Sequence, residues 1–215
     1  MLPGTGSDEV FVRSVFLEPL SQVGLHLHAP ATRSVAEHLS ALDEAAKAHP
    51  IVVGGISLGA HLAALWASRN PGRCAGLVLA LPAWSGPPAD APAAMAARLS
   101  ANTVQRDGVE RALAGVDGWL AAELHRAWRR YGDGLAAHLA EAADTDAPTE
   151  EQLSNLSAPT GIAACTDDPV HPLEVAQRWA KAIPRAALET TTLAALGADR
   201  ASLGRAAVAA WLACR

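Results

Sequence analysis

The sequence of 215 residues has no apolar run long enough to cross a bilayer, and it has no excess of basic residues, since its formal net charge is −5. A membrane-spanning helix needs about 20 consecutive apolar residues. A dedicated nucleic-acid-binding protein is typically basic. The composition therefore predicts neither a membrane segment nor a nucleic-acid partner.

Cysteine is also scarce, and the three cysteines (Cys74, Cys165 and Cys214) form no Cys-x-x-Cys or Cys/His pair with metal-ligand spacing. A small, odd number of cysteines is typical of a reducing compartment. The first residues, Met1–Asp8, lack the basic start and apolar stretch of a signal peptide. We therefore expect a cytoplasmic protein without a metal site or a cofactor.

What the chain does contain is a regular alternation of short apolar runs with helical patterns, which indicates an α/β fold: a mostly parallel sheet flanked by helices. The runs predict strands at Leu25–Ala29, Ile51–Gly55, Ala75–Leu81, Thr160–Cys165 and Ala187–Thr192. The helical patterns cover Val10–Val23, Val35–Ala48, Leu58–Ser68, Leu173–Ala182 and Leu203–Cys214.

A long helical segment interrupts this alternation. It follows the proline-rich stretch Pro82–Pro92, runs over Ala93–Ala143 with breaks near Asp107–Gly108 and Tyr131–Gly134, and ends in an acidic linker, Asp144–Glu151. We predict a sheet domain formed by residues 1–87 and 152–215, with a helical lid inserted at 88–151.

The strongest motif is Gly55-Ile56-Ser57-Leu58-Gly59, which lies between the predicted strand Ile51–Gly55 and the predicted helix Leu58–Ser68. In a Gly-x-Ser-x-Gly elbow a strained turn exposes the serine hydroxyl above the sheet. The glycines leave room for the neighbouring backbone. The amide of Leu58, at the start of the helix, can face a developing oxyanion. The motif in this context predicts Ser57 as a nucleophile.

With this elbow, the whole chain resembles the α/β-hydrolase family, in its lid-bearing, esterase-like branch. Three further segments match: Pro3–Ser7 resembles the oxyanion loop, Leu156–Gly161 the lead into the late strand, and Asp167–Pro172 the loop with the triad acid. The resemblance implies that the amides of Thr5 and Leu58 form an oxyanion hole. It also implies that 93–143 covers the substrate pocket.

The resemblance also implies a carboxylate after the late strand, which orients a histidine. The pattern Asp-Pro-x-x-Pro aligns Asp168 with this position, and Asp167 is the alternative. Either aspartate can instead cap the helix that begins near Pro172.

The general base is harder to assign. The family's histidine usually follows the last strand as Gly-His, but Gly197 is followed here by Ala198, and no histidine follows His171 in the chain. The order Ser, Asp, His is therefore satisfied only by His171. The other histidines considered as bases are His61 on the elbow helix, His26 and His28 on a predicted strand, and His125 and His138 on the lid.

The start of the chain departs from the family as well. Only Met1 and Leu2 precede the oxyanion loop, where the family has a strand beside the nucleophile strand. Unpaired backbone groups in a buried gap are costly. We expect that residues precede Met1, that the sheet closes up, or that a partner chain fills the gap.

These features predict a serine hydrolase that acts on a small ester or related acyl substrate, with Ser57, Asp168 and His171 as catalytic residues. Trp84, which follows a strand and opens the lid linker, either lines the acyl pocket or anchors the lid to the core. The alternative function is a catalytically degenerate α/β-hydrolase fold that binds a small ligand or partner without turnover. We expect a small-molecule substrate, and a homo-oligomer is compatible with the sequence.

Overall fold

The computed structural model describes residues 1–215 and contains a four-stranded parallel sheet in the order β1-β2-β3-β4. The strands are β1 (Ile51–Ile56), β2 (Cys74–Ala80), β3 (Thr160–Cys165) and β4 (Ala186–Thr191). β2 and β3 are almost entirely buried and read as continuous runs of small and aliphatic residues, as expected where helices cover both faces of a parallel sheet.

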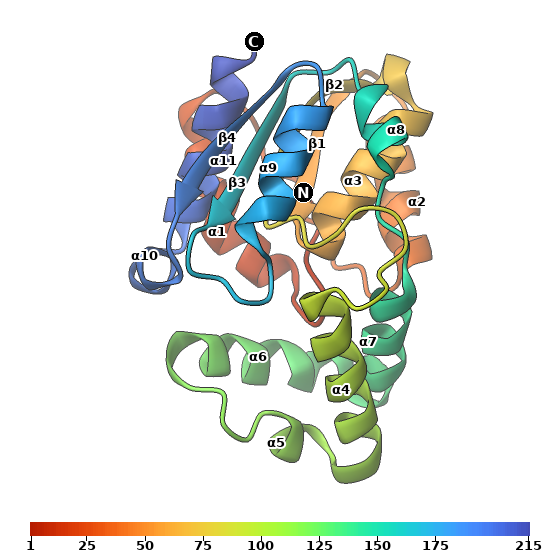
Figure 1. Cartoon of the computed structure of the whole chain (residues 1–215), viewed down its shortest axis with the longest axis vertical. Helices are drawn as coiled ribbons and strands as arrows, with labels where there is room; N and C mark the ends of the chain where they lie inside the picture. Colours follow the sequence, from red (N-terminus) through yellow and green to blue (C-terminus); the bar gives the residue numbers. More distant parts are fainter.

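Helices cover the two faces of the sheet, and the helices between residues 92 and 144, where a lid is predicted, form a third group below the sheet (Figure 1). One face packs against α1 (Glu9–Gln22) and α11 (Ala201–Ala213), and the other against α2 (Val35–Ala45), α3 (Leu58–Arg69), α8 (Glu150–Ser154) and α9 (Leu173–Ala182). Each face has its own apolar core. None of the helices is both long and apolar enough to span a bilayer.

The lid helices lie below the carboxyl ends of the strands (Figure 1). They are α4 (Pro92–Asp107), α5 (Val109–Ala112), α6 (Gly118–Tyr131) and α7 (Leu135–Asp144), with a short 3-10 turn, η2 (Gly132–Gly134), before α7. Arg98 fixes α4 to α7, because its guanidinium donates to the carbonyl of Ala143 and to the carboxylate of Asp144 at 3.0 Å each. The division into a core and a lid at 88–151 stays a prediction.

The observed helices and strands largely agree with those predicted from the sequence, and one prediction is wrong. The predicted strand Leu25–Ala29 forms no strand, because no neighbouring strand pairs with it. Only Leu2 lies beside β1 on that side: its N–H donates to the carbonyl of Gly54 at 2.8 Å, and its carbonyl accepts from Ile56 at 3.2 Å. Four short elements were not predicted: η1 (Pro71–Arg73), η2, α8, and α10 (Leu193–Ala198).

Candidate active site

Ser57 lies in a tight turn where β1 ends and α3 begins. Its φ of 53° and ψ of −115° are unusual for a residue with a side chain, and strain of this kind costs about 1–3 kcal/mol. The N–H of Ser57 donates to the carbonyl of Ala80 on β2 at 2.9 Å, which holds the turn on the sheet. A side chain at Gly55 would place its Cβ 2.6 Å from the carbonyl carbon of Gly59, so the elbow closes only with glycine there.

His171 connects Ser57 to Asp168. Its Nε2 lies 3.0 Å from Oγ of Ser57, and its Nδ1 lies 2.8 Å from Oδ2 of Asp168. With the ring proton on Nδ1, the hydroxyl donates to Nε2 while Nδ1–H donates to the carboxylate. The side chains of His171 and Asp168 are only 17% and 6% exposed. The arrangement has the geometry of a Ser-His-Asp triad.

The carboxylate of Asp168 uses its two oxygens differently. Oδ2 binds His171, while Oδ1 accepts from the backbone amides of Val170 at 2.8 Å and His171 at 3.1 Å. Burial acts to raise the pKa of Asp168, but the hydrogen bond and charge of His171, with these two amides, outweigh it and lower the pKa below the ordinary value. Asp168 is therefore an ionised group that orders its own loop and orients the imidazole.

Asp167, the alternative acid, points elsewhere. Its Oδ1 accepts from the backbone amide of Leu193 at 2.7 Å, at the first residue of α10. Of the two aspartates, the structure brings only Asp168 into contact with the histidine beside Ser57.

The predicted oxyanion loop lies against the elbow. A Cβ at Gly4 would be 3.3 Å from Cβ of Ser57, and the N–H of Ser7 closes a turn to the carbonyl of Gly4 at 3.0 Å. Inside this turn the amide of Thr5 has no acceptor within the chain. The amide of Leu58, the first residue of α3, lacks an intrahelical acceptor. The amide of Thr5, in the loop against the elbow, and the amide of Leu58, in the residue after Ser57, are thus both without an acceptor in the chain.

The family model described as serine aminopeptidase, S33, matches residues 20–196 of the chain. The chain belongs to this α/β-hydrolase family. The match covers both sides of the elbow, the lid and the loop with Asp168 and His171.

Solved structures of other α/β hydrolases share the fold. A hydrolase from Pseudomonas aeruginosa is 22% identical with a TM-score of 0.70, and the match covers 98% of this chain and 88% of the other. An enol-lactonase from Burkholderia xenovorans is 14% identical with a TM-score of 0.70 (98% and 90% covered). An esterase from a Rhodococcus species is 15% identical with a TM-score of 0.62 (89% and 80% covered). No curated protein matches the sequence.

No other histidine side chain forms a hydrogen bond with the Ser57 hydroxyl. His61 is fully buried, its Nε2 accepts from the amide of Ala83 at 2.9 Å, and burial, with the nearby charge of His171, lowers its pKa to about 3. It is therefore a neutral residue that fixes the loop after β2. His26 and His28 are exposed, His125 lies near Glu110, and His138 stacks on Tyr131.

Ala198, where the resemblance places a histidine, is the last residue of the α10 helix. The guanidinium of Arg200 donates to the carbonyls of Leu196 at 2.7 Å and Gly197 at 2.6 Å, and it lies 4.3 Å from the ring centre of Trp119 on α6. The segment where the resemblance places the base thus forms the end of α10. Arg200 binds the carbonyls of this helix end and contacts Trp119 of α6.

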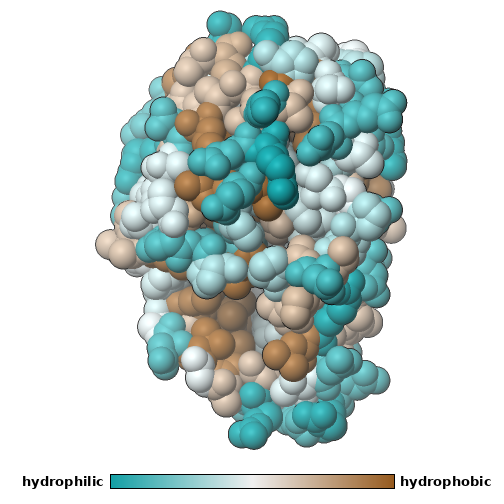
Figure 2. Space-filling view, viewed as in Figure 1, coloured by the Kyte–Doolittle hydropathy of each residue, from teal (hydrophilic) through white to brown (hydrophobic).

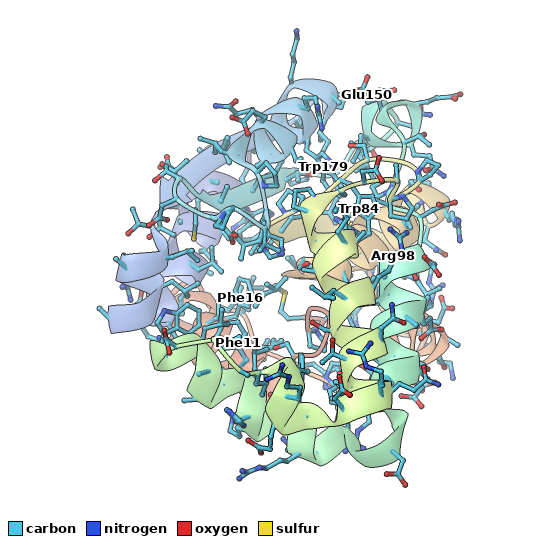
Figure 3. The ribbon with its side chains drawn as sticks, turned by 60° about the horizontal axis from the view of Figure 1, so that its bottom comes forward. Phe11, Phe16, Trp84, Arg98, Glu150 and Trp179 are labelled. Carbon is cyan, nitrogen blue, oxygen red and sulfur yellow. The ribbon has the colours of Figure 1, made fainter.

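Trp84 lies in the core between α3 and α9. It packs edge-on against His61, with ring centres 4.5 Å apart, and its carbonyl accepts from the indole of Trp179 at 3.2 Å (Figure 3). These contacts agree with an anchor for the lid linker. The alternative role, lining the acyl pocket, stays a prediction.

One cluster of residues beside the site, centred on Asp8, was not predicted from the sequence. Asp8 caps α1, and its buried carboxylate binds two guanidinium groups of the lid helix α6: those of Arg126 at 2.5 and 2.9 Å, and of Arg130 at 3.0 Å. The hydroxyl of Tyr131 donates to the carbonyl of Ser7 at 2.7 Å. This Asp8 clasp ties the lid to the end of the oxyanion loop. Arg126, Arg129 and Arg130 lie close together in the sequence, but the sequence does not indicate a partner 118 residues before Arg126.

Proposed function

We propose that the protein is a serine hydrolase acting on small, uncharged esters or related acyl compounds. The observation that carries this proposal is the pair of hydrogen bonds joining Ser57 to His171 and His171 to Asp168. A serine hydroxyl needs such a base to attack near neutral pH.

In this mechanism Oγ of Ser57 attacks the ester carbonyl carbon while Nε2 of His171 takes its proton. The carbonyl oxygen becomes an oxyanion, which accepts from the amides of Thr5 and Leu58. His171 then gives the proton to the departing alkoxide, leaving Ser57 acylated. Water then enters, and its oxygen attacks the acyl carbon while His171 takes a proton from it. Collapse of the second tetrahedral intermediate breaks the bond to Oγ, releases the acid and returns the proton to Ser57.

The charge near the site supports an uncharged acyl substrate rather than a peptide with a free amino group. An aminopeptidase holds the ammonium group of its substrate, and a free carboxylate is the natural partner for it. The carboxylates of Asp8 and Asp168 are each occupied, the first by Arg126 and Arg130 and the second by His171. The carboxylate of Asp167 accepts from the amide of Leu193.

The lid surface supports an apolar acyl chain. Figure 2 shows a hollow lined by hydrophobic residues in the lower half of the molecule, where Figure 1 places the lid helices α4 and α6. Three of the large apolar side chains with the most exposed surface lie on these two helices: Met95 (54%) and Leu99 (70%) on α4, and Leu120 (42%) on α6. Met95 and Leu99, four residues apart, share one face of α4.

A fluorophosphonate probe tests the nucleophile directly. We expect stoichiometric labelling of the wild type at Ser57, with none in Ser57→Ala and little in His171→Gln. The variant His125→Gln, which changes a lid histidine beside Glu110, should label as the wild type does. A panel of p-nitrophenyl esters, lactones and aminoacyl p-nitroanilides should then show turnover of the esters or lactones first. An unlabelled wild type would refute the proposal.

A non-catalytic binding protein is the second candidate, and Ala198 in place of the family's histidine favours it. Ser57 is also only 8% exposed. Ester hydrolysis that disappears in Ser57→Ala rules this candidate out. Ligand-induced thermal stabilisation without any turnover, unchanged in Ser57→Ala, would favour it.

A further inference from the structure

The second half of the lid helix α6 contacts three consecutive residues at the end of the predicted oxyanion loop. The indole of Trp128 lies against Gly6, where a Cβ would be only 2.6 Å from its Nε1. The hydroxyl of Tyr131 donates to the carbonyl of Ser7 at 2.7 Å. The carboxylate of Asp8 binds two guanidinium groups of the same helix in the Asp8 clasp. The lid thus holds the loop through its backbone as well as through a side chain.

Thr5, whose amide is a proposed oxyanion donor, lies between these contacts and the sheet. Before it, Leu2 pairs with β1. After it, the N–H of Ser7 closes a turn on the carbonyl of Gly4 at 3.0 Å. Thr5 and Gly6 are the central residues of this turn, and the φ of 65° at Gly6 is in the left-handed region that favours glycine. The direction of the Thr5 amide therefore depends on what holds the far end of the turn.

The hydroxyl of Tyr131 is well suited to hold that end. The residue is only 8% exposed, and its ring stacks on that of His138 with ring centres 4.8 Å apart. Burial, together with the charge of Asp8, raises the pKa of the hydroxyl above its ordinary value. The group is therefore protonated at neutral pH and donates to the carbonyl of Ser7 from a side chain that packing keeps in place.

We propose that Tyr131 is a positioning residue of the oxyanion hole: by holding the carbonyl of Ser7, it keeps the Thr5 amide directed at the substrate oxygen. Trp128 supports the same turn at Gly6. Oxyanion donors are effective because they are fixed before the reaction begins, so the hole is complete only while α6 is seated on the loop. This inference rests on the proposed function, because it requires Ser57 to generate an oxyanion.

The test compares two ketones that carry the acyl chain of the best ester substrate. With the trifluoromethyl ketone, Oγ of Ser57 adds to the carbonyl carbon, His171 takes the hydroxyl proton, and the carbonyl oxygen becomes an oxyanion held as in hydrolysis. The methyl ketone is far less electrophilic and binds without forming this bond. The first inhibition constant therefore reports binding of the transition state, and the second reports binding of the ground state.

Tyr131→Phe removes only the hydroxyl and retains the ring that stacks on His138. It should lower kcat/KM for the ester about tenfold and raise the Ki of the trifluoromethyl ketone by the same factor, since a misdirected donor costs less than the 10²–10³ of a lost one. The Ki of the methyl ketone should stay within about twofold of the wild type. A change that merely loosened the fold would not separate the two ketones.

Gly6→Ala disturbs the same turn from the other side, because its Cβ meets Trp128 and its φ is strained. It should raise the Ki of the trifluoromethyl ketone selectively as well. Arg129→Gln, which changes an exposed residue of α6, should leave both inhibition constants and kcat/KM as in the wild type. Thermal melting of each variant confirms that it is folded.

Two outcomes would overturn the positioning role while leaving the proposed function intact. In the first, a wild type that hydrolyses esters is matched by Tyr131→Phe in the Ki of the trifluoromethyl ketone. In the second, Tyr131→Phe weakens both ketones equally, which would show that the residue shapes the pocket instead. A wild type that hydrolyses no ester and binds both ketones equally would refute the proposed function, and the positioning role with it.

Discussion

Nε2 of His171 lies 3.0 Å from Oγ of Ser57, although 114 positions separate the two residues. Its acid partner, Asp168, lies only three positions before it on the same loop. The proposed acid and base therefore both lie in the loop that follows β3, while Ser57 follows β1. The relative position of the carboxyl ends of these two strands places all three side chains.

His171→Gln should lower kcat at least about 10³-fold, because glutamine keeps the approximate size but cannot accept and return the proton. Asp168→Asn should also lower kcat strongly, although less than His171→Gln does, because the amide no longer stabilises an imidazolium. The measurement is steady-state hydrolysis of the best ester from the panel, with His125→Gln as the matched control. A kcat within tenfold of the wild type in His171→Gln would exclude this histidine as the base.

The sequence was informative where the signal is local. The elbow around Ser57 was predicted because strand, turn and helix are contiguous, and His171 was a candidate because only it follows Asp168 in the chain. The error at Leu25–Ala29 has the opposite cause, since strand pairing depends on a neighbour that is distant in sequence or missing. The Asp8 clasp and the α10 helix end depend on such distant partners too.

Asp8→Asn should destabilise the protein by about 1–3 kcal/mol. Asparagine still caps α1, but it leaves the guanidinium groups of Arg126 and Arg130 without their carboxylate partner. Breaking a buried ion pair costs more than this, but the two arginines are 32% and 43% exposed, so water compensates in part. Urea denaturation at pH 7 measures the change.

Arg129→Gln is the matched control for the Asp8 clasp. Arg129 lies on the same helix, is 72% exposed, and approaches only Glu110, at 3.5 Å. Its replacement should change the free energy of unfolding by less than about 0.5 kcal/mol. Equal effects of Asp8→Asn and Arg129→Gln would show that the clasp contributes no more than a surface pair.

The stability of the fold should fall as the pH drops below about 6.5, and His61 should account for part of this fall. Burial lowers the pKa of His61 to about 3, whereas an unfolded chain has a histidine pKa of about 6.5. Between these values the unfolded chain binds a proton that the folded chain does not, so stability is lost as the pH falls, by up to ~1.4 kcal/mol per unit. His38, with a pKa lowered to about 4 by burial and by His138, acts in the same direction.

His61→Gln tests this pH dependence, since the glutamine carbonyl can still accept from Ala83. Between pH 7 and pH 5 the variant should lose about 2 kcal/mol less stability than the wild type. His26→Gln, which changes an exposed histidine, should follow the wild type. Urea denaturation at several pH values provides both curves, and parallel curves for His61→Gln and the wild type would contradict the prediction.

Gly204→Ala should destabilise the contact between α11 and α1, although alanine favours a helix more than glycine does. A Cβ at Gly204 would collide with the carbonyl oxygen of Val15 and lie 3.1 Å from Cγ of Pro19. The overpacking costs about 1–3 kcal/mol, which exceeds the gain of at most ~1 kcal/mol in helix propensity. Gly72→Ala is the control, because nothing lies within 4 Å of its Cβ, and its effect should be near zero or stabilising. Thermal melting of both variants measures the difference, and a Tm for Gly204→Ala at or above that of Gly72→Ala would show that α11 moves away from α1 without cost.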